Sequence, residues 1–142
     1  MICYFDTSAL VPLLIDEPSS EFCRHLWDEA DDVVTTQLLY VEAAAALAQA
    51  LRMGRLITPN HRTALHILDQ MWAEFDIVRV NDDLVRRAAQ LAQTCALRGY
   101  DAVHCASAEQ LDDDDLVVAS GDGKVLDACA ALGLATADTN NS

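Results

Sequence analysis

Short apolar runs alternate with longer helical patterns along this 142-residue chain. The runs are rich in β-branched and aromatic residues, whereas apolar residues in the segments between them recur with helical spacing. Such alternation is typical of an α/β protein in which helices cover a parallel sheet. The predicted strands are Ile2–Phe5, Val33–Thr36, Ile77–Val80, Leu116–Ala119 and Leu134–Thr136. The first and fourth are almost continuously apolar, so we expect them at the centre of the sheet.

The predicted helices occupy most of the remaining chain. They are Ser8–Leu14, Ser19–Glu29, Leu38–Met53, Asn60–Glu74, Asp82–Arg98, Ala102–Leu111 and Lys124–Leu132. Gly54, Gly99 and Gly133 each follow one of them, at the position where a left-handed residue commonly ends a helix. Two long helices follow one another between residues 38 and 74, and we expect them to form an α-hairpin on one edge.

Length and composition predict one domain of residues 1–137 and a frayed polar tail of residues 138–142. A hydrophobic content of 52% suffices for a core without disulfides. The five cysteines contain no Cys-x-x-Cys pair, so we expect small buried side chains in a reducing compartment. No basic leader precedes the first strand, and no apolar run approaches the ~20 residues of a membrane span. We therefore expect a cytoplasmic protein with no membrane partner.

The chain is strongly acidic, with nine Lys and Arg residues against 23 Asp and Glu residues and a net charge of −14. This charge disfavours nonspecific attraction to nucleic-acid phosphates. It does not exclude an enzyme that meets nucleic acid at a single site, because bound cations can reverse the sign of the local field.

Four acidic residues stand beside apolar segments, where burying a carboxylate gains little. Asp6 follows the first strand, Asp122 follows the fourth, Asp101 opens a helix, and Glu42 lies one turn into another. Ligands of open α/β sheets bind at the carboxyl ends of the strands, so the acids converge if the two strands are neighbours. Two ionised carboxylates about 5 Å apart repel by roughly 3 kcal/mol at an effective dielectric near 20. The cluster must take up a proton or hold a hard divalent cation, and we favour the cation.

Each acid also has a purely structural interpretation. Asp6, Asp101 and Asp122 could cap helices, a role worth about 1 kcal/mol that Ser, Thr or Asn would fill equally well. Glu42 is the most informative of the four, because a glutamate in an apolar helical stretch must face solvent or a polar pocket.

Three polar neighbours are given structural roles. His104 lies one helical turn after Asp101 and could join the site, but a lone histidine between apolar residues more often packs in the core, so the predicted site leaves it out. Ser8 and Ser120 are expected to cap helices rather than to support the acids. The acidic run 112–115 lacks the glycine and spacing of a calcium loop, and we expect it to be solvated.

Four sequence blocks carry a family resemblance. They are ICYFDTSALVPLL (2–14), YVEAAAAL (40–47), GYDAVHCASA (99–108) and ASGDGKVL (119–126). In content, order and spacing, the chain from Met1 to about Ala137 resembles a PIN domain, specifically a VapC-type toxin. The resemblance implies a three-layer fold with a central five-stranded parallel sheet and a pocket that binds Mg²⁺ or Mn²⁺. It also implies an endoribonuclease that leaves a 5′-phosphate, a cognate antitoxin as partner, and a homodimer.

The resemblance assigns catalytic roles to Asp6, Glu42, Asp101 and Asp122. In the mechanism we expect, the three aspartates hold the metal and Glu42 positions or deprotonates the attacking water. One departure from the family pattern is Ser120 in Ser-x-Asp, where Thr-x-Asp is also usual, and the lost β-branch weakens the expectation for Asp122.

Two other functions remain open from the sequence. A phosphatase could use Asp6 as a nucleophile at the end of the first strand, but it would normally have a second acid at the position of Ser8. A noncatalytic PIN-like binding module would keep the fold and the acids and act only through a partner. An aspartyl-phosphate trap tests the first, and metal-dependent RNA cleavage tests the second.

Overall fold

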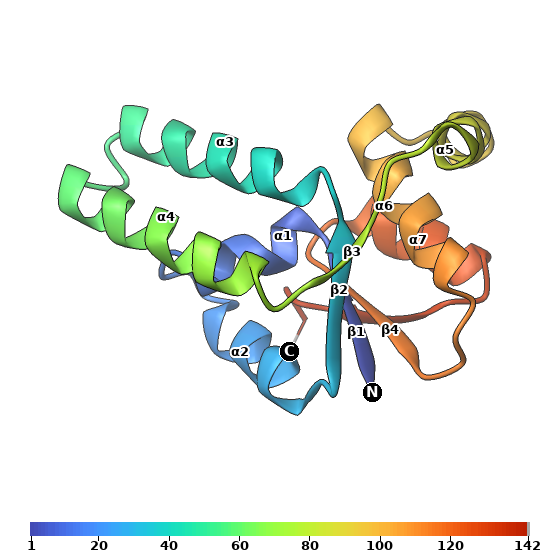
Figure 1. The fold of residues 1–142 in the computed structure, drawn as a ribbon, viewed down its shortest axis with the longest axis horizontal. Coiled ribbons are helices and arrows are strands. Elements are labelled where there is room, and N and C mark those ends of the chain that lie inside the picture. The colour runs from blue at the N-terminus through green and yellow to red at the C-terminus, as the bar shows by residue number, and fades with distance from the viewer. Residues whose placement is uncertain (142) are drawn as a thin grey trace.

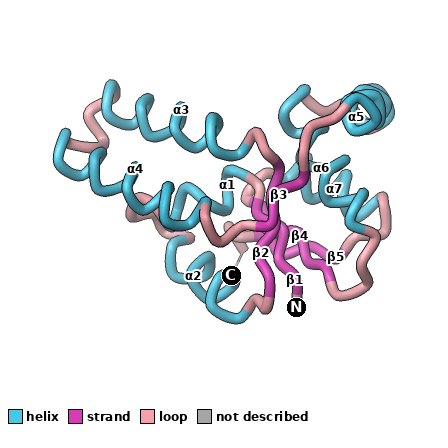
Figure 2. The backbone as a smooth tube through the Cα atoms, in the orientation of Figure 1, coloured by secondary structure: helices cyan, strands magenta, loops and turns pink. Residues whose placement is uncertain are grey.

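The computed structural model describes residues 1–141, so Ser142, the end of the predicted tail, lies outside the described residues. Within residues 1–141 a parallel five-stranded sheet with the order β3-β2-β1-β4-β5 lies between two helical layers (Figures 1 and 2). The strands are β1 (Ile2–Phe5), β2 (Asp32–Thr36), β3 (Asp76–Val78), β4 (Leu116–Ser120) and β5 (Ala135–Asp138). The predicted α/β class and parallel sheet are confirmed.

The helices form two groups, one on each face of the sheet (Figure 1). The first group is α1 (Thr7–Leu10), the 3-10 helix η1 (Val11–Leu13), α2 (Ser20–Glu29), α3 (Leu39–Arg52) and α4 (Thr58–Trp72). The second group is α5 (Asp82–Thr94), α6 (Gly99–Leu111) and α7 (Gly123–Ala131). As predicted, α3 and α4 pair as a hairpin that extends away from the sheet. In the described chain, no helix is both long and apolar enough to cross a membrane.

The period-two alternation of the central strand builds a core on each face of the sheet. On β1, Cys3 and Phe5 pack in a cluster with Leu39 of α3, whereas Tyr4 packs with Leu91 of α5 and Val125 of α7. Both faces of β1 are therefore buried, which explains why its sequence is a continuous apolar run.

The strand order places the ends of β1 and β4 side by side. β1 is the middle strand, and its register with β4 pairs Phe5 with Ala119. The Asp6 backbone N–H donates to the Ala119 carbonyl at 3.2 Å, so the pairing continues one residue past β1. Since the chain passes to β2 on one side of β1 and to β4 on the other, this edge is the switch point where open α/β sheets bind ligands.

The largest error among the predicted helix boundaries lies between α5 and α6. The helix expected over residues 82–98 ends at Thr94, and Ala96 takes the left-handed conformation with φ of 53°. The chain turns here because Leu97 enters the core, where its exposed fraction is 7%. Gly99 therefore begins α6 instead of ending α5. Gly54 and Gly133 have positive φ after their helices, as predicted.

The polar C-terminal segment is partly ordered against the rest of the protein. β5 includes Asp138, the side chain of Thr139 is buried, and the Asn140 amide donates to the Gly121 carbonyl at 2.8 Å. The expected fraying is thus not seen at these residues, because they find partners at the turn after β4. The division between a domain of residues 1–137 and a tail of residues 138–142 stays a prediction.

Candidate active site at the carboxyl ends of β1 and β4

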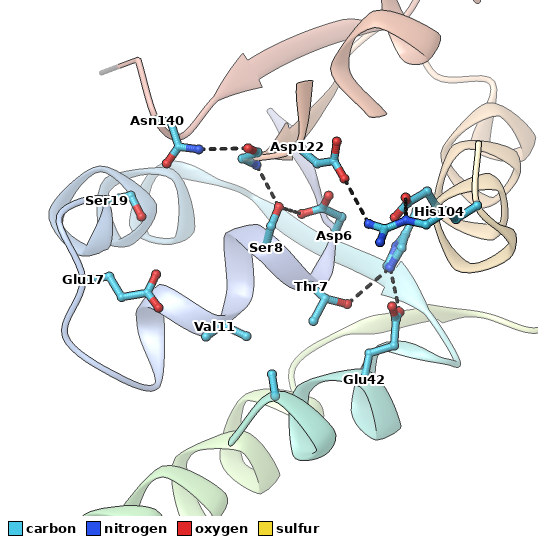
Figure 3. A pocket seen from close by; sticks show the side chains of 14 residues that line it. Asp6, Thr7, Ser8, Val11, Glu17, Ser19, Glu42, His104, Asp122 and Asn140 are labelled. Carbon is cyan, nitrogen blue, oxygen red and sulfur yellow. Dashed lines mark hydrogen bonds and ion pairs between the residues drawn. The ribbon is translucent and has the colours of Figure 1, made fainter. Parts of the chain in front are cut away.

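One cavity at this edge of the sheet is lined by all four predicted site residues (Figure 3). Asp6 follows β1, Glu42 lies in the first turn of α3, Asp101 lies in the first turn of α6, and Asp122 precedes α7. His104, which the sequence prediction left out, lines the same cavity. The fold therefore gathers acids from both helical layers around the end of the central strand.

Asp6 is the most enclosed of the four acids, with 4% of its surface exposed. Its carboxylate caps α1 by accepting from the Ala9 backbone N–H at 3.0 Å. It also accepts from the Ser8 hydroxyl at 2.6 Å and from the Ser120 hydroxyl at 2.5 Å. The expectation that the two serines cap helices is wrong, because both hydroxyls instead fix the Asp6 carboxylate at the cavity wall.

Burial raises the pKa of the Asp6 carboxyl, and the hydrogen bonds from the Ser120 and Ser8 hydroxyls offset only part of this effect. The folded protein therefore binds this proton more tightly than the unfolded chain, in which aspartate titrates near pH 3.9. The contribution of Asp6 to the free energy of unfolding must therefore fall as the pH rises from about 4 through the raised pKa.

We expect Asp6→Asn to remove this fall, because asparagine does not ionise. In metal-free buffer the variant should become more stable relative to the wild type as the pH rises from about 4 toward neutrality. Urea unfolding with EDTA at a series of pH values measures the difference. A difference that does not change with pH would contradict the assignment of a raised pKa to Asp6.

The turn after β4 is tied to both Asp6 and Asp122. The Ser120 hydroxyl, which donates to Asp6, accepts from the Asp122 backbone N–H at 3.0 Å. The Gly121 backbone N–H donates to the Ser8 hydroxyl at 2.8 Å, and Asp122 caps α7 by accepting from Lys124 N–H at 2.9 Å. These bonds hold Asp122 in place although a serine stands where the family pattern also allows threonine.

Gly121 is required by close packing against the C-terminal segment. A Cβ atom at this position would lie 2.9 Å from Thr139 Oγ1 and 3.1 Å from Asn140 Nδ2. We expect Gly121→Ala to lower the free energy of unfolding by roughly 1–3 kcal/mol, the usual effect of overpacking. Gly123→Ala is the matched control, since a Cβ there meets nothing within 4 Å. Urea unfolding should show the loss only for Gly121→Ala, and equal effects at both glycines would contradict the clash.

A guanidinium group lies between two of the acids. Arg98 Nε is 3.3 Å from Asp101 Oδ2, and a terminal guanidinium nitrogen of Arg98 is 4.0 Å from Asp122 Oδ2. Arg98 occupies the N-cap position of α6, so the capping interpretation of Asp101 is wrong. The Asp101 carboxylate is instead directed to the cavity, where it pairs with a cation supplied by the chain itself.

Glu42 is held by a histidine from the opposite helical layer. His104 Nε2 on α6 lies 2.8 Å from Glu42 Oε1 on α3, and its Nδ1 lies 2.9 Å from the Tyr4 hydroxyl. Thr7 Oγ1 lies 3.3 Å from the same Nε2. The sequence contained one indication of this arrangement, because His104 follows Asp101 by one turn on the same helix.

The donor set fits a hard divalent cation, although it is not a preformed coordination sphere. Carboxylate oxygens are the ligands that Mg²⁺ and Mn²⁺ prefer. The position of the Arg98 guanidinium near Asp101 and Asp122 also indicates that this part of the cavity attracts positive charge. Among residues 1–141, however, no three His, Cys, Asp or Glu side chains form a group that could hold a metal ion as placed.

Comparisons with known proteins agree with one another. A family model described as "PIN domain" matches residues 3–139. Ribonuclease VapC45 from Mycobacterium tuberculosis is 38% identical over 132 residues, which cover 93% of this chain and 92% of the relative.

Two solved structures share the fold. FitAcB from Neisseria gonorrhoeae superimposes with a TM-score of 0.72 at 20% identity, and the match covers 100% of both chains. A toxin-antitoxin complex from Klebsiella pneumoniae gives a TM-score of 0.62 at 17% identity, covering 87% of this chain and 89% of the other.

Proposed function

This chain belongs to the PIN domain family, and we propose that it is a metal-dependent endoribonuclease, the toxin of a toxin-antitoxin pair. The main support for the proposal is the cavity at the ends of β1 and β4 that Asp6, Glu42, Asp101 and Asp122 all line. The 38% identical relative, which is named a ribonuclease, supports RNA as the substrate.

In the proposed mechanism, the residues around the cavity have different roles. Asp6, Asp101 and Asp122 would hold Mg²⁺ or Mn²⁺, which would supply positive charge to the scissile phosphate and acidify the attacking water. Ser8 and Ser120 keep the Asp6 carboxylate in place through their hydroxyls. Glu42 would accept a proton of the water as its oxygen bonds to phosphorus and the bond to the 3′-oxygen breaks; the 3′-oxygen would take up a proton from solvent, leaving a 5′-phosphate on the other fragment.

The Arg98 guanidinium would have to leave Asp101 and Asp122 when a divalent cation binds there. Its side chain is 86% exposed, so solvent can accommodate the released guanidinium at little cost. The freed group would stand at the rim of an otherwise acidic cavity, where it can meet the phosphates of an approaching RNA.

The partners we propose are an antitoxin and a second copy of the chain. The toxin-antitoxin complex that shares the fold supports the first. For the homodimer, half-exposed Val85 and Tyr100 flank an apolar groove between α5 and α6 that offers a contact surface. We propose that the protein acts in the cytoplasm.

The test is RNA cleavage by the purified protein, freed of any antitoxin. We expect cleavage with Mg²⁺ or Mn²⁺ and none with EDTA, and the products should be sensitive to an exonuclease that requires a 5′-phosphate. Absence of cleavage across diverse RNAs would overturn the proposal and favour the noncatalytic binding module.

A further inference from the structure

His104 is buried between the two helical layers, and both of its ring nitrogens have partners. Its exposed fraction is 3%, and the ring stands edge-on to Tyr4 at a centroid distance of 5.9 Å. The ring links Tyr4 on the central strand to Glu42 on α3, which are 38 positions apart in sequence. Burial alone requires a partner for each ring nitrogen, but the partner of Nε2 is a carboxylate that lines the cavity, and this choice of partner calls for an explanation.

The partners determine which nitrogen carries the proton. An ionised Glu42 carboxylate can only accept, so Nε2 must donate to it at 2.8 Å. The Tyr4 hydroxyl then donates to Nδ1 at 2.9 Å, because a neutral ring has one donor and one acceptor. Burial raises the pKa of the Tyr4 hydroxyl well above its usual range, so this donor stays protonated. All three groups are satisfied without any charge on the imidazole.

We propose that His104 is a positioning residue whose Nε2–H donates to Glu42 while its Nδ1 accepts from Tyr4, so that the ring N–H directs the Glu42 carboxylate into the cavity. The inference rests on the proposed ribonuclease function, in which Glu42 accepts a proton of the attacking water. Without the ring, the partly buried Glu42 side chain has several rotamers, and only some of them direct its oxygens into the cavity. In the opposite tautomer, Nε2 would present a lone pair to the carboxylate and repel it.

Three substitutions at position 104 distinguish a role of the ring in positioning Glu42 from a role in packing alone. Glutamine places its amide nitrogen near the position of Nε2, whereas asparagine places it near Nδ1, so only His104→Gln keeps a donor for Glu42. We expect His104→Ala and His104→Asn to lower kcat by about tenfold or more with KM unchanged, as is usual for residues that orient a catalytic group. His104→Gln should recover most of this loss. Cys105→Ala, which trims a buried core side chain next to His104 on the same helix, should keep the wild-type kcat.

The loss should also depend on Glu42. In a Glu42→Gln background, His104→Ala should cause little further loss of kcat, because the group that the ring aims is already inactive. Full additivity of the two losses, or an active His104→Asn variant that folds normally, would overturn the proposal.

A spectroscopic measurement on the protein without metal or RNA keeps the inference distinct from the ribonuclease proposal. Long-range ¹⁵N–¹H correlation spectra should show His104 as the neutral Nε2–H tautomer in the wild type and in Cys105→Ala. Tyr4→Phe should weaken this preference, since it removes the hydroxyl that donates to Nδ1. A wild-type Nδ1–H tautomer would overturn the positioning role even if RNA is cleaved. The Nε2–H tautomer in a protein that cleaves no RNA would instead count against the proposed function alone.

Discussion

Asp6→Asn is expected to lower the rate of metal-dependent RNA cleavage by about 100- to 1,000-fold, the usual cost of removing one electrostatic group from an active site. The substitution keeps the shape of the side chain and an oxygen that can accept from the Ala9 backbone N–H. It removes the charge on the most enclosed acid of the cavity. The loss should therefore come from weaker cation binding and not from a misfolded protein. Initial rates on a labelled RNA over a range of Mg²⁺ concentrations measure it.

Asp113→Asn is the matched control for this substitution. Asp113 lies in the exposed acidic loop that leads into β4, at the opposite end of the strand from the cavity. Its side chain accepts from the Asp115 backbone N–H at 2.8 Å, a bond that asparagine retains. We expect this variant to cleave RNA at the wild-type rate. Similar losses in the two variants would show that general acidity, and not the cavity, determines the activity.

Mg²⁺ is expected to stabilise the folded protein without any RNA present. At about 100 times its dissociation constant, a ligand that binds only the folded state adds roughly 2.7 kcal/mol to the free energy of unfolding. For a chain of this length the gain corresponds to several degrees in melting temperature. The effect should be large here because the cation relieves repulsion among carboxylates that the fold brings to one cavity. Thermal unfolding with and without Mg²⁺ measures the shift.

The variants predict a specific pattern of metal response. Asp6→Asn should lose most of the Mg²⁺-induced shift and should be at least as stable as the wild type in EDTA, because it also removes a buried charge. Asp113→Asn should keep the full shift. Because the folded chain carries a net charge of −14, some general stabilisation by divalent ions is expected in every variant. Equal shifts in all three proteins would therefore contradict a specific site that includes Asp6.

Local sequence patterns predicted the elements well where neighbouring residues determine the backbone. The strands begin and end within one or two residues of the predictions, because apolar runs of this length have few alternatives. The end of α5 was missed because the chain leaves the helical path after Thr94, so that Leu97 can enter the core. Propensity carries no information about which side chain the core needs at a chain reversal.

The sequence alone determined the order of strands and helices, the two-sided burial of β1, and the placement of acids just past the ends of β1 and β4. These features depend on residues close together in the chain and on the periods of helices and strands. Only the tertiary structure decided that Ser120 donates to Asp6 across 114 positions, that Arg98 lies near both Asp101 and Asp122, and that His104 reaches Glu42 across 62. Such contacts follow from the packing of two helical layers around one sheet edge, and no local pattern encodes the partner of a side chain that distant.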